Sequence, residues 1–257
     1  MRRGLVIASV ILFGALKVTG QNKHQEELQL LADHVFNLSE IMLHDVANPP
    51  AASRFYAYAL LGAYEAALFG QHQLPDLNSK LNVNPGIQPI TPPKTFNLSF
   101  CTNYTMLSVG RQIMPSGALL EEKQKNLVTY FRKKKKLSKE DVDQQIAYCE
   151  RIASQVVQYA RTDAYNKLST YTRYTPSKKE GHWYPTPPEY MAAIEPQWKT
   201  IRPFFVDSAR QFAPPPPAPF SKDTTSSFHR QMREVYNVSK KLTTEQTEIS
   251  NFWDCNP

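Results

Sequence analysis

The chain has 257 residues, of which 41% are hydrophobic and 21% are charged, and this globular composition suits one large domain or two small ones. Only 9 glycines occur beside 20 prolines, which argues against phosphate-binding loops built from repeated glycine. The formal charge is +7.

Residues 1–20 have the features of an export signal. Two arginines precede an apolar run over 5–16, and small residues over 18–20 offer a cleavage point. The run is too short to span a bilayer comfortably and Lys17 closes it, so no stable membrane anchor is expected. Cleavage would leave 27 basic and 23 acidic residues, a net charge of +4 that does not demand a nucleic-acid partner. We expect an exported protein, periplasmic or secreted.

Helical periodicity dominates the residues that follow. Apolar residues at three- and four-residue steps predict an amphipathic helix over 25–46, which Asn48-Pro-Pro50 would end. A second helix, about 51–69, is apolar on most sides and therefore belongs inside a bundle. Residues 71–96 contain five prolines and predict an irregular connection. The expected buried stripe of the first helix is Leu28, Leu31, Val35, Leu38 and Met42.

Three more helices are predicted before position 165. Two cover 98–113 and 118–131, and a basic turn over Arg132–Lys136 follows them. The third begins after Ser138, because Ser138 and Asp141 have the spacing of a capping box. Its buried stripe would be Val142, Ile146, Cys149, Ile152, Val156 and Ala160.

The chain changes character over about 171–220, which holds 11 of the 20 prolines and many aromatic residues. We predict an irregular segment with one short helix over 189–199 and an extended spacer at the proline run. Two helices follow, over 224–238 and from Thr243, whose spacing to Gln246 predicts another capping box. The predicted fold class is all-α, a helical bundle with a long proline- and aromatic-rich irregular segment.

Cysteine and histidine positions predict no metal site. Cys101, Cys149 and Cys255 are widely spaced and match no zinc pattern, so the favoured interpretation is buried thiols or one incidental disulfide. The six histidines include no His-Glu-x-x-His pair. The pairs Asp33–His34 and Glu40–His44 are interpreted as ordinary helix-surface pairs.

Two further segments admit a binding role. The basic cluster Arg132–Lys136 could meet phosphate, an anionic membrane or nucleic acid, but a solvated turn is the favoured interpretation. The aromatic stretch Tyr171–Tyr190, with His182 and Trp183, could line a carbohydrate or small-molecule groove. Such a stretch more often fixes an extended segment onto a helical core.

The second half of the chain carries a family resemblance. It rests on Arg173-Tyr-Thr-Pro, on residues 180–188 (EGHWYPTPP) and 195–204 (EPQWKTIRPF), and on the closing residues 252–257 (FWDCNP). These resemble the exported vanadium-dependent haloperoxidase-like proteins of the type 2 phosphatidic acid phosphatase superfamily. The resemblance implies a helical-bundle enzyme that binds phosphate or vanadate. It implies a small-molecule substrate and a vanadate cofactor for the full-length protein, and it leaves homo-oligomerisation open.

The family's site has three parts: a Lys followed later by Arg-Pro, then Pro-Ser-Gly-His, then Ser-Arg followed by His. Lys and two Arg neutralise a tetrahedral oxyanion, while one His attacks phosphorus or ligates vanadium and the other donates a proton. Here each part is incomplete and the order is wrong, so we interpret the matches as chance. We therefore assign no catalytic, cofactor-binding or metal-binding residue. The partial matches are Arg202-Pro203 with Glu195 in place of the Lys, Pro115-Ser-Gly117 followed by Ala118, and Ser53-Arg54 with Leu60 in place of the His.

These observations lead to two hypotheses. The first is that residues 21–257 form the N-terminal helical part of a phosphatase or haloperoxidase-type domain, truncated after the apolar pair Phe252-Trp253 and inactive by itself. The second is a non-catalytic exported helical binding or assembly protein. Phosphatase and haloperoxidase activity are not separated at this stage.

Overall fold

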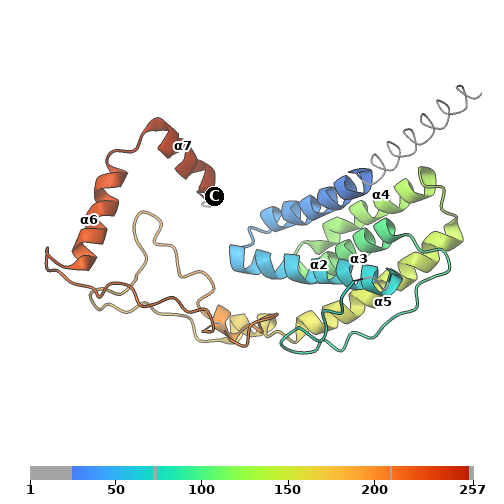
Figure 1. Ribbon diagram of the computed structural model, residues 1–257, viewed down its shortest axis with the longest axis horizontal. Helices are drawn as coiled ribbons and strands as arrows, with labels where there is room; N and C mark the ends of the chain where they lie inside the picture. The colour runs from blue at the N-terminus through green and yellow to red at the C-terminus, as the bar shows by residue number, and fades with distance from the viewer. Residues whose placement is uncertain (1–24, 72–73, 209, 255–257) are drawn as a thin grey trace, which may run out of the picture. The chain divides into compact units, whose positions relative to one another are not determined.

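A computed structural model describes residues 25–71, 74–208 and 210–254 (Figure 1). Within these residues the chain forms α-helices and short 3-10 helices and no β-strand, which confirms the all-α prediction. The predicted export signal over 1–20 and the third cysteine, Cys255, lie outside the described residues. No helix in the described ranges has the length and apolar character needed to span a membrane.

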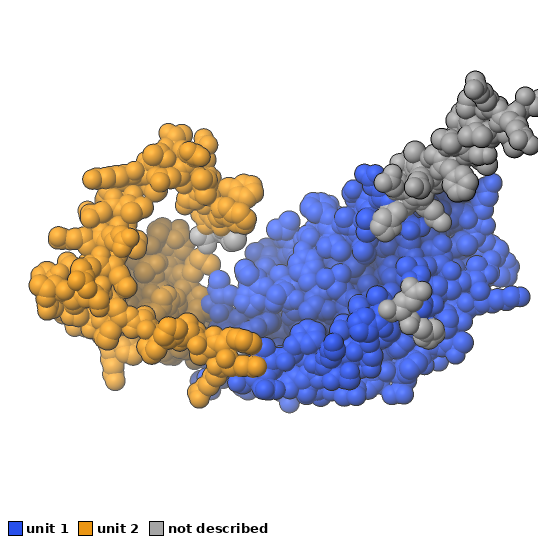
Figure 2. Space-filling model, viewed as in Figure 1, with its two compact units in different colours: residues 1–172, 194–208 blue, residues 173–193, 209–257 orange. Residues whose placement is uncertain are grey.

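The chain divides into two compact units, which Figure 2 colours separately. Unit 1 consists of Met1–Thr172 and Ile194–Ser208, and unit 2 consists of Arg173–Ala193 and Ala209–Pro257. The irregular segment predicted over about 171–220 is therefore shared between the two units.

Unit 1 begins with a helical segment over 25–44, followed by α2 (Pro49–Gln71). The prediction that Asn48-Pro-Pro50 only ends the first helix is incomplete, because the same residues start α2. The Asn48 Oδ1 atom accepts a hydrogen bond from the Ala51 backbone N at 3.0 Å, as an N-cap does. Proline is tolerated in the first turn of a helix, where its missing N–H has no intrahelical partner to lose.

The helices α3 (Leu98–Ile113), α4 (Leu120–Lys133) and α5 (Lys139–Arg161) complete the bundle of unit 1. The short 3-10 helix η1 (Gly117–Leu119) leads into α4. Helix α3 is central, since it packs against α2, α4 and α5 (Figure 1). Gly62 lets α2 approach α3 closely, because a Cβ at that position would lie 2.7 Å from the Val109 Cγ2 atom.

The predicted buried stripes are largely confirmed. In the first helix Leu38 and Met42 are buried, and Leu31 and Val35 are half-buried against the core. Leu28 is 53% exposed, so the prediction for it is wrong. In α5 the whole predicted stripe is buried except Ile146, which is half-buried. The basic turn is shorter than predicted, because α4 continues through Lys133.

The N-terminus of α5 departs in one detail from the predicted capping box. The Ser138 Oγ atom accepts from the Asp141 backbone N at 3.0 Å, as expected. The Asp141 carboxylate accepts from the Ser138 hydroxyl at 2.7 Å, whereas a full box would have it accept from the Ser138 backbone.

Cys101 and Cys149 are buried and unbridged, so of the two interpretations left open, buried thiols apply at these two positions. They lie where α3 meets α5, and the Cys149 thiol is 3.6 Å from the Cys101 carbonyl oxygen. The contact with Cys149, together with burial, raises the pKa of the Cys101 thiol.

The predicted helix over 189–199 is wrong. Only a 3-10 turn, η3 (Trp198–Thr200), forms in this region. Glu195 precedes Pro196, and the proline ring disfavours helical backbone at the preceding residue. Glu195 instead has a positive φ of 46°.

Unit 2 contains α6 (Ser227–Ser239) and α7 (Thr244–Trp253). The capping box of Thr243 and Gln246 is confirmed in both directions. Helix α6 begins later than predicted, after Ser226, because Asp223 Oδ1 accepts from the Thr225 N and holds a turn there. No described residue of unit 2 is buried.

Candidate functional site

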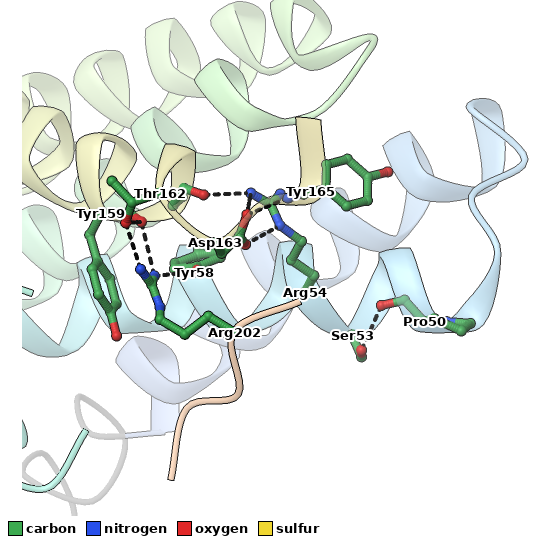
Figure 3. Close-up of polar contacts among 10 residues, drawn as sticks. Pro50, Ser53, Arg54, Tyr58, Tyr159, Thr162, Asp163, Tyr165 and Arg202 are labelled. Atoms are coloured by element: carbon green, nitrogen blue, oxygen red, sulfur yellow. Dashed lines mark hydrogen bonds and ion pairs between the residues drawn. The ribbon is translucent and has the colours of Figure 1, made fainter. Parts of the chain in front are cut away.

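Arg54 and Asp163, which are 109 positions apart in the sequence, form a buried ion pair in unit 1 (Figure 3). The Arg54 Nε atom donates to Asp163 Oδ2 at 2.6 Å, and Nη2 donates to Asp163 Oδ1 at 3.3 Å and to the Ala160 carbonyl at 3.0 Å. The exposed fractions of the two side chains are 7% and 1%. This two-point geometry joins α2 to the end of α5.

Arg202 brings a second guanidinium group to the same end of α5. The group stacks 3.7 Å from the centroid of the Tyr159 ring. Its Nη1 donates to Thr162 Oγ1 at 2.5 Å, and its Nη2 donates to Tyr58 Oη and to the Tyr159 carbonyl, both at 2.9 Å. The Arg202 backbone N also donates to the Asp163 carbonyl at 3.1 Å. These contacts fix the 194–208 segment on the bundle (Figure 3).

Tyrosines surround the two arginines. The Arg54 guanidinium lies 4.3 Å from the Tyr165 ring centroid and 5.0 Å from that of Tyr58, both within cation–π range. Burial, and then the nearby charge of Asp163, raise the pKa of Tyr58 well above its usual range. The Tyr58 hydroxyl therefore stays protonated.

Arg54 and Arg202 are the two arginines of the partial oxyanion motifs, Ser53-Arg54 and Arg202-Pro203. Their donors point to Asp163, to carbonyl oxygens and to hydroxyl groups of the protein itself. A vanadate or phosphate cradle needs those donors free. These residues therefore do not fit the anion, and their arrangement is structural.

The third partial motif, Pro115-Ser-Gly117, connects α3 to η1. A Cβ at Gly117 would lie 2.2 Å from the Arg111 carbonyl oxygen, so glycine is required by close backbone approach. The Ser116 backbone N donates to the Asp45 carboxylate at 3.0 Å. Ala118 lies in η1, and Leu60 is 42% exposed on α2. Each partial motif thus has a local structural explanation, and the absence of catalytic residues stays a prediction.

The histidine pairs differ from expectation at His34. Instead of lying on the helix surface, His34 is buried, with only 6% of its surface exposed. Its Nδ1 atom hydrogen-bonds Asn103 Oδ1 at 2.9 Å. Burial lowers the pKa of His34, which favours the neutral ring. The surface interpretation holds for His44, which is exposed. Across the described part of the chain, no group of three or more His, Cys, Asp or Glu residues could hold a metal ion.

The basic cluster Arg132–Lys136 is partly neutralised inside unit 1. The Lys135 ammonium donates to Glu26 Oε2 at 2.8 Å, and Glu26 Oε1 accepts from the Tyr130 hydroxyl at 2.5 Å. The other basic residues of the cluster are exposed. This matches the solvated turn that the sequence favours.

The aromatic stretch Tyr171–Tyr190 is exposed. The Tyr174 and Trp183 rings lie 6.3 Å apart, and both side chains are close to half exposed. Nearby in unit 2, Lys222 pairs with Glu180 at 2.5 Å and Gly181 lies against the Phe220 ring. Unit 2 thus presents aromatic side chains on its surface.

Comparisons with known proteins identify the fold. No family model matches the chain, and no curated protein sequence matches it. A match to a solved structure gives the chain a vanadium haloperoxidase-like fold, and the resemblance found in the sequence is confirmed at that level.

The particular structure is a crystal structure described as that of the first bacterial vanadium-dependent iodoperoxidase. The two chains share 32% sequence identity with a TM-score of 0.80. The match covers 89% of this chain and 56% of the iodoperoxidase chain. This sequence therefore spans little more than half the length of the enzyme it resembles.

Proposed function

We propose that this chain is the N-terminal scaffold portion of an exported enzyme of the vanadium haloperoxidase or acid phosphatase type. In this proposal its helices form one side of the bundle, and the oxyanion-binding residues come from chain beyond the present sequence. The observation that carries the proposal is the fold match at 32% identity, which covers nearly all of this chain but only 56% of the iodoperoxidase.

Two features of the chain support this proposal. The arginines of the partial motifs are held by Asp163 and neighbouring oxygens, so these two side chains form no free cradle for a tetrahedral anion. Unit 2 also exposes apolar side chains on helices whose N-termini are well capped. An apolar surface of this kind is typical of a contact with further protein. The exposed apolar residues of α6 and α7 include Met232, Val235, Tyr236, Ile249, Phe252 and Trp253.

The test compares two proteins. One is the chain of residues 1–257, and the other continues through whatever the same reading frame encodes next. We expect the longer protein to oxidise iodide or bromide, or to hydrolyse phosphate esters, with vanadate-dependent activity that phosphate inhibits. The 257-residue chain should show neither activity. Turnover by the 257-residue chain that phosphate suppresses would overturn the scaffold assignment.

A non-catalytic binding or assembly role is the second candidate, favoured by the exposed aromatic residues of unit 2, among them Tyr174, Trp183 and Tyr184. Aromatic residues are enriched at protein interfaces. A stop codon directly after Pro257, in a protein that is stable and monomeric, would support this role over the scaffold of an enzyme. A reading frame that continues into the complete oxyanion motifs would exclude it.

A further inference from the structure

The first helical segment of unit 1 and α2 lie side by side (Figure 1), and together they present an outer face without charged side chains. The Ser39 and Tyr56 hydroxyl groups meet at 2.6 Å and join the two helices along this outer face. Three large apolar side chains stand out from it, since Phe36 is 62%, Leu43 75% and Leu60 42% exposed. The residues that share the outer face at helical spacing are Ala32, Phe36, Ser39 and Leu43 on the first segment and Ser53, Ala57, Leu60 and Tyr64 on α2.

Helix α2 has the composition of a helix that is covered on every side. Its only two charged residues, Arg54 and Glu65, are both buried, so none of its exposed positions is charged. A helix of this kind normally lies inside a larger bundle. The sequence predicted that position for α2, but α3, α5 and the first segment leave its outer face exposed.

The other helices of unit 1 have a different kind of surface. Helix α4 exposes Glu122 and Lys125, and α5 exposes Asp143 and Arg151, as is typical of helices in contact with water. Charged residues are depleted at the centre of protein interfaces, where apolar and aromatic residues are buried. The outer face therefore has the composition of a protein contact, whereas the exposed sides of α4 and α5 do not.

The relative indicates what covers this face. Its match includes 89% of this chain but only 56% of the iodoperoxidase, so a little under half of that enzyme has no counterpart here. A further part of the same polypeptide is held next to the outer face by the chain itself. It therefore loses less translational and rotational freedom on docking than a separate molecule would.

We propose that the outer face is the docking surface for the remainder of the enzyme, the part that corresponds to the unmatched portion of the iodoperoxidase. This inference rests on the proposed function, because it requires the longer protein. The remainder would place an uncharged, largely apolar helix against Phe36, Leu43 and Leu60 and bury all three. The contact uses no oxyanion chemistry, so it can be tested separately from activity.

Hydroxyl-radical footprinting, read by mass spectrometry, measures this burial in the 257-residue chain and in the longer protein of the same reading frame. Phe36 should react about tenfold more slowly in the longer protein if its exposed fraction falls from 62% to the 6% of Ile41, a core residue of the same helix. Leu43 and Leu60 should also be protected. Leu119, which is 51% exposed on η1, is the control and should react equally in both proteins.

A charge placed in the outer face gives a second measurement. Leu60→Glu should leave the urea midpoint of the 257-residue chain unchanged, because the new carboxylate stays in water there. In the longer protein the same carboxylate would be buried without a partner, so the midpoint should fall by about 1 M. Leu119→Glu, at a similarly exposed leucine, is the matched control and should change neither midpoint.

Equal reactivity of Phe36 and Leu60 in the two proteins would overturn the inference, whatever the activity of the longer protein. Protection already present in the 257-residue chain would also overturn it, and a doubled mass in sedimentation would then assign the face to a second copy. A stop codon directly after Pro257 would overturn both this inference and the proposed function. An inactive longer protein with a protected outer face would contradict the proposed function alone.

Discussion

Units 1 and 2 use similar helices in opposite ways. Unit 1 buries its apolar stripes in one core around α3, and a buried ion pair joins α2 to the residues just after α5. Unit 2 has helices with well-formed N-caps but no buried residue among those described. The comparison shows that local signals are enough to specify a helix, whereas a core requires several helices that share apolar faces.

Removal of the Asp163 carboxylate should have the largest effect on unit 1. Asp163→Ala leaves the Arg54 guanidinium buried and unpaired, so we expect a loss of about 3–5 kcal/mol in unfolding free energy. Urea denaturation measures it. The double variant Arg54→Met/Asp163→Leu removes both charges and should recover most of the loss. A loss below about 1 kcal/mol in Asp163→Ala would mean that the pair does not hold unit 1 together.

The same truncation placed in each unit tests the difference in burial directly. Ile152→Ala in α5, at 0% exposure, should reduce the unfolding free energy by about 2–5 kcal/mol. Ile249→Ala in α7, at 53% exposure, should change it by no more than about 0.5 kcal/mol. Equal effects of the two substitutions on the denaturation midpoint would contradict the absence of a core among the described residues of unit 2.

Replacement of Glu65 should stabilise unit 1 in a pH-dependent way. Because the pKa of Glu65 rises from 4.5 to about 7 on folding, the folded protein binds the extra proton and its stability falls as the pH rises from about 4.5 to 7. Glu65→Gln removes that decline. Its unfolding free energy should exceed that of wild type by up to about 3 kcal/mol more at pH 8 than at pH 4, measured by urea denaturation. A difference between variant and wild type that does not vary with pH would exclude the protonated acid.

The smallest expected effect concerns the N-terminus of α7. Thr243→Ala removes the acceptor of the Gln246 backbone N–H and should destabilise α7 by about 1 kcal/mol. Since α7 lies in unit 2, far-ultraviolet circular dichroism should report lost helix while the unfolding midpoint of unit 1 stays constant. Thr243→Ser retains the hydroxyl and is the control. A shifted midpoint for unit 1 would show that the two units unfold as one.

The candidate site was the part that sequence reasoning could recover least. The pattern singled out Arg54 and Arg202 only as fragments of a family motif, and it gave no reason to single out Asp163. Ion pairing between positions 54 and 163 leaves no periodic signal, because it depends on where α2 and α5 meet. A charged residue inside an otherwise apolar helix, as at Glu65, was the one available hint.

The sequence by itself determined the helical class of this protein, most helix boundaries, the caps at Ser138 and Thr243, and the resemblance that the fold comparison supports. These features depend on neighbours within a few positions, or on residues kept in order along the chain. Only the tertiary structure decided which helices gain a core, that His34 is buried, and that the arginines are held by the protein's own oxygens. Burial and charge pairing depend on distances between segments far apart in the sequence, and no local pattern encodes those distances.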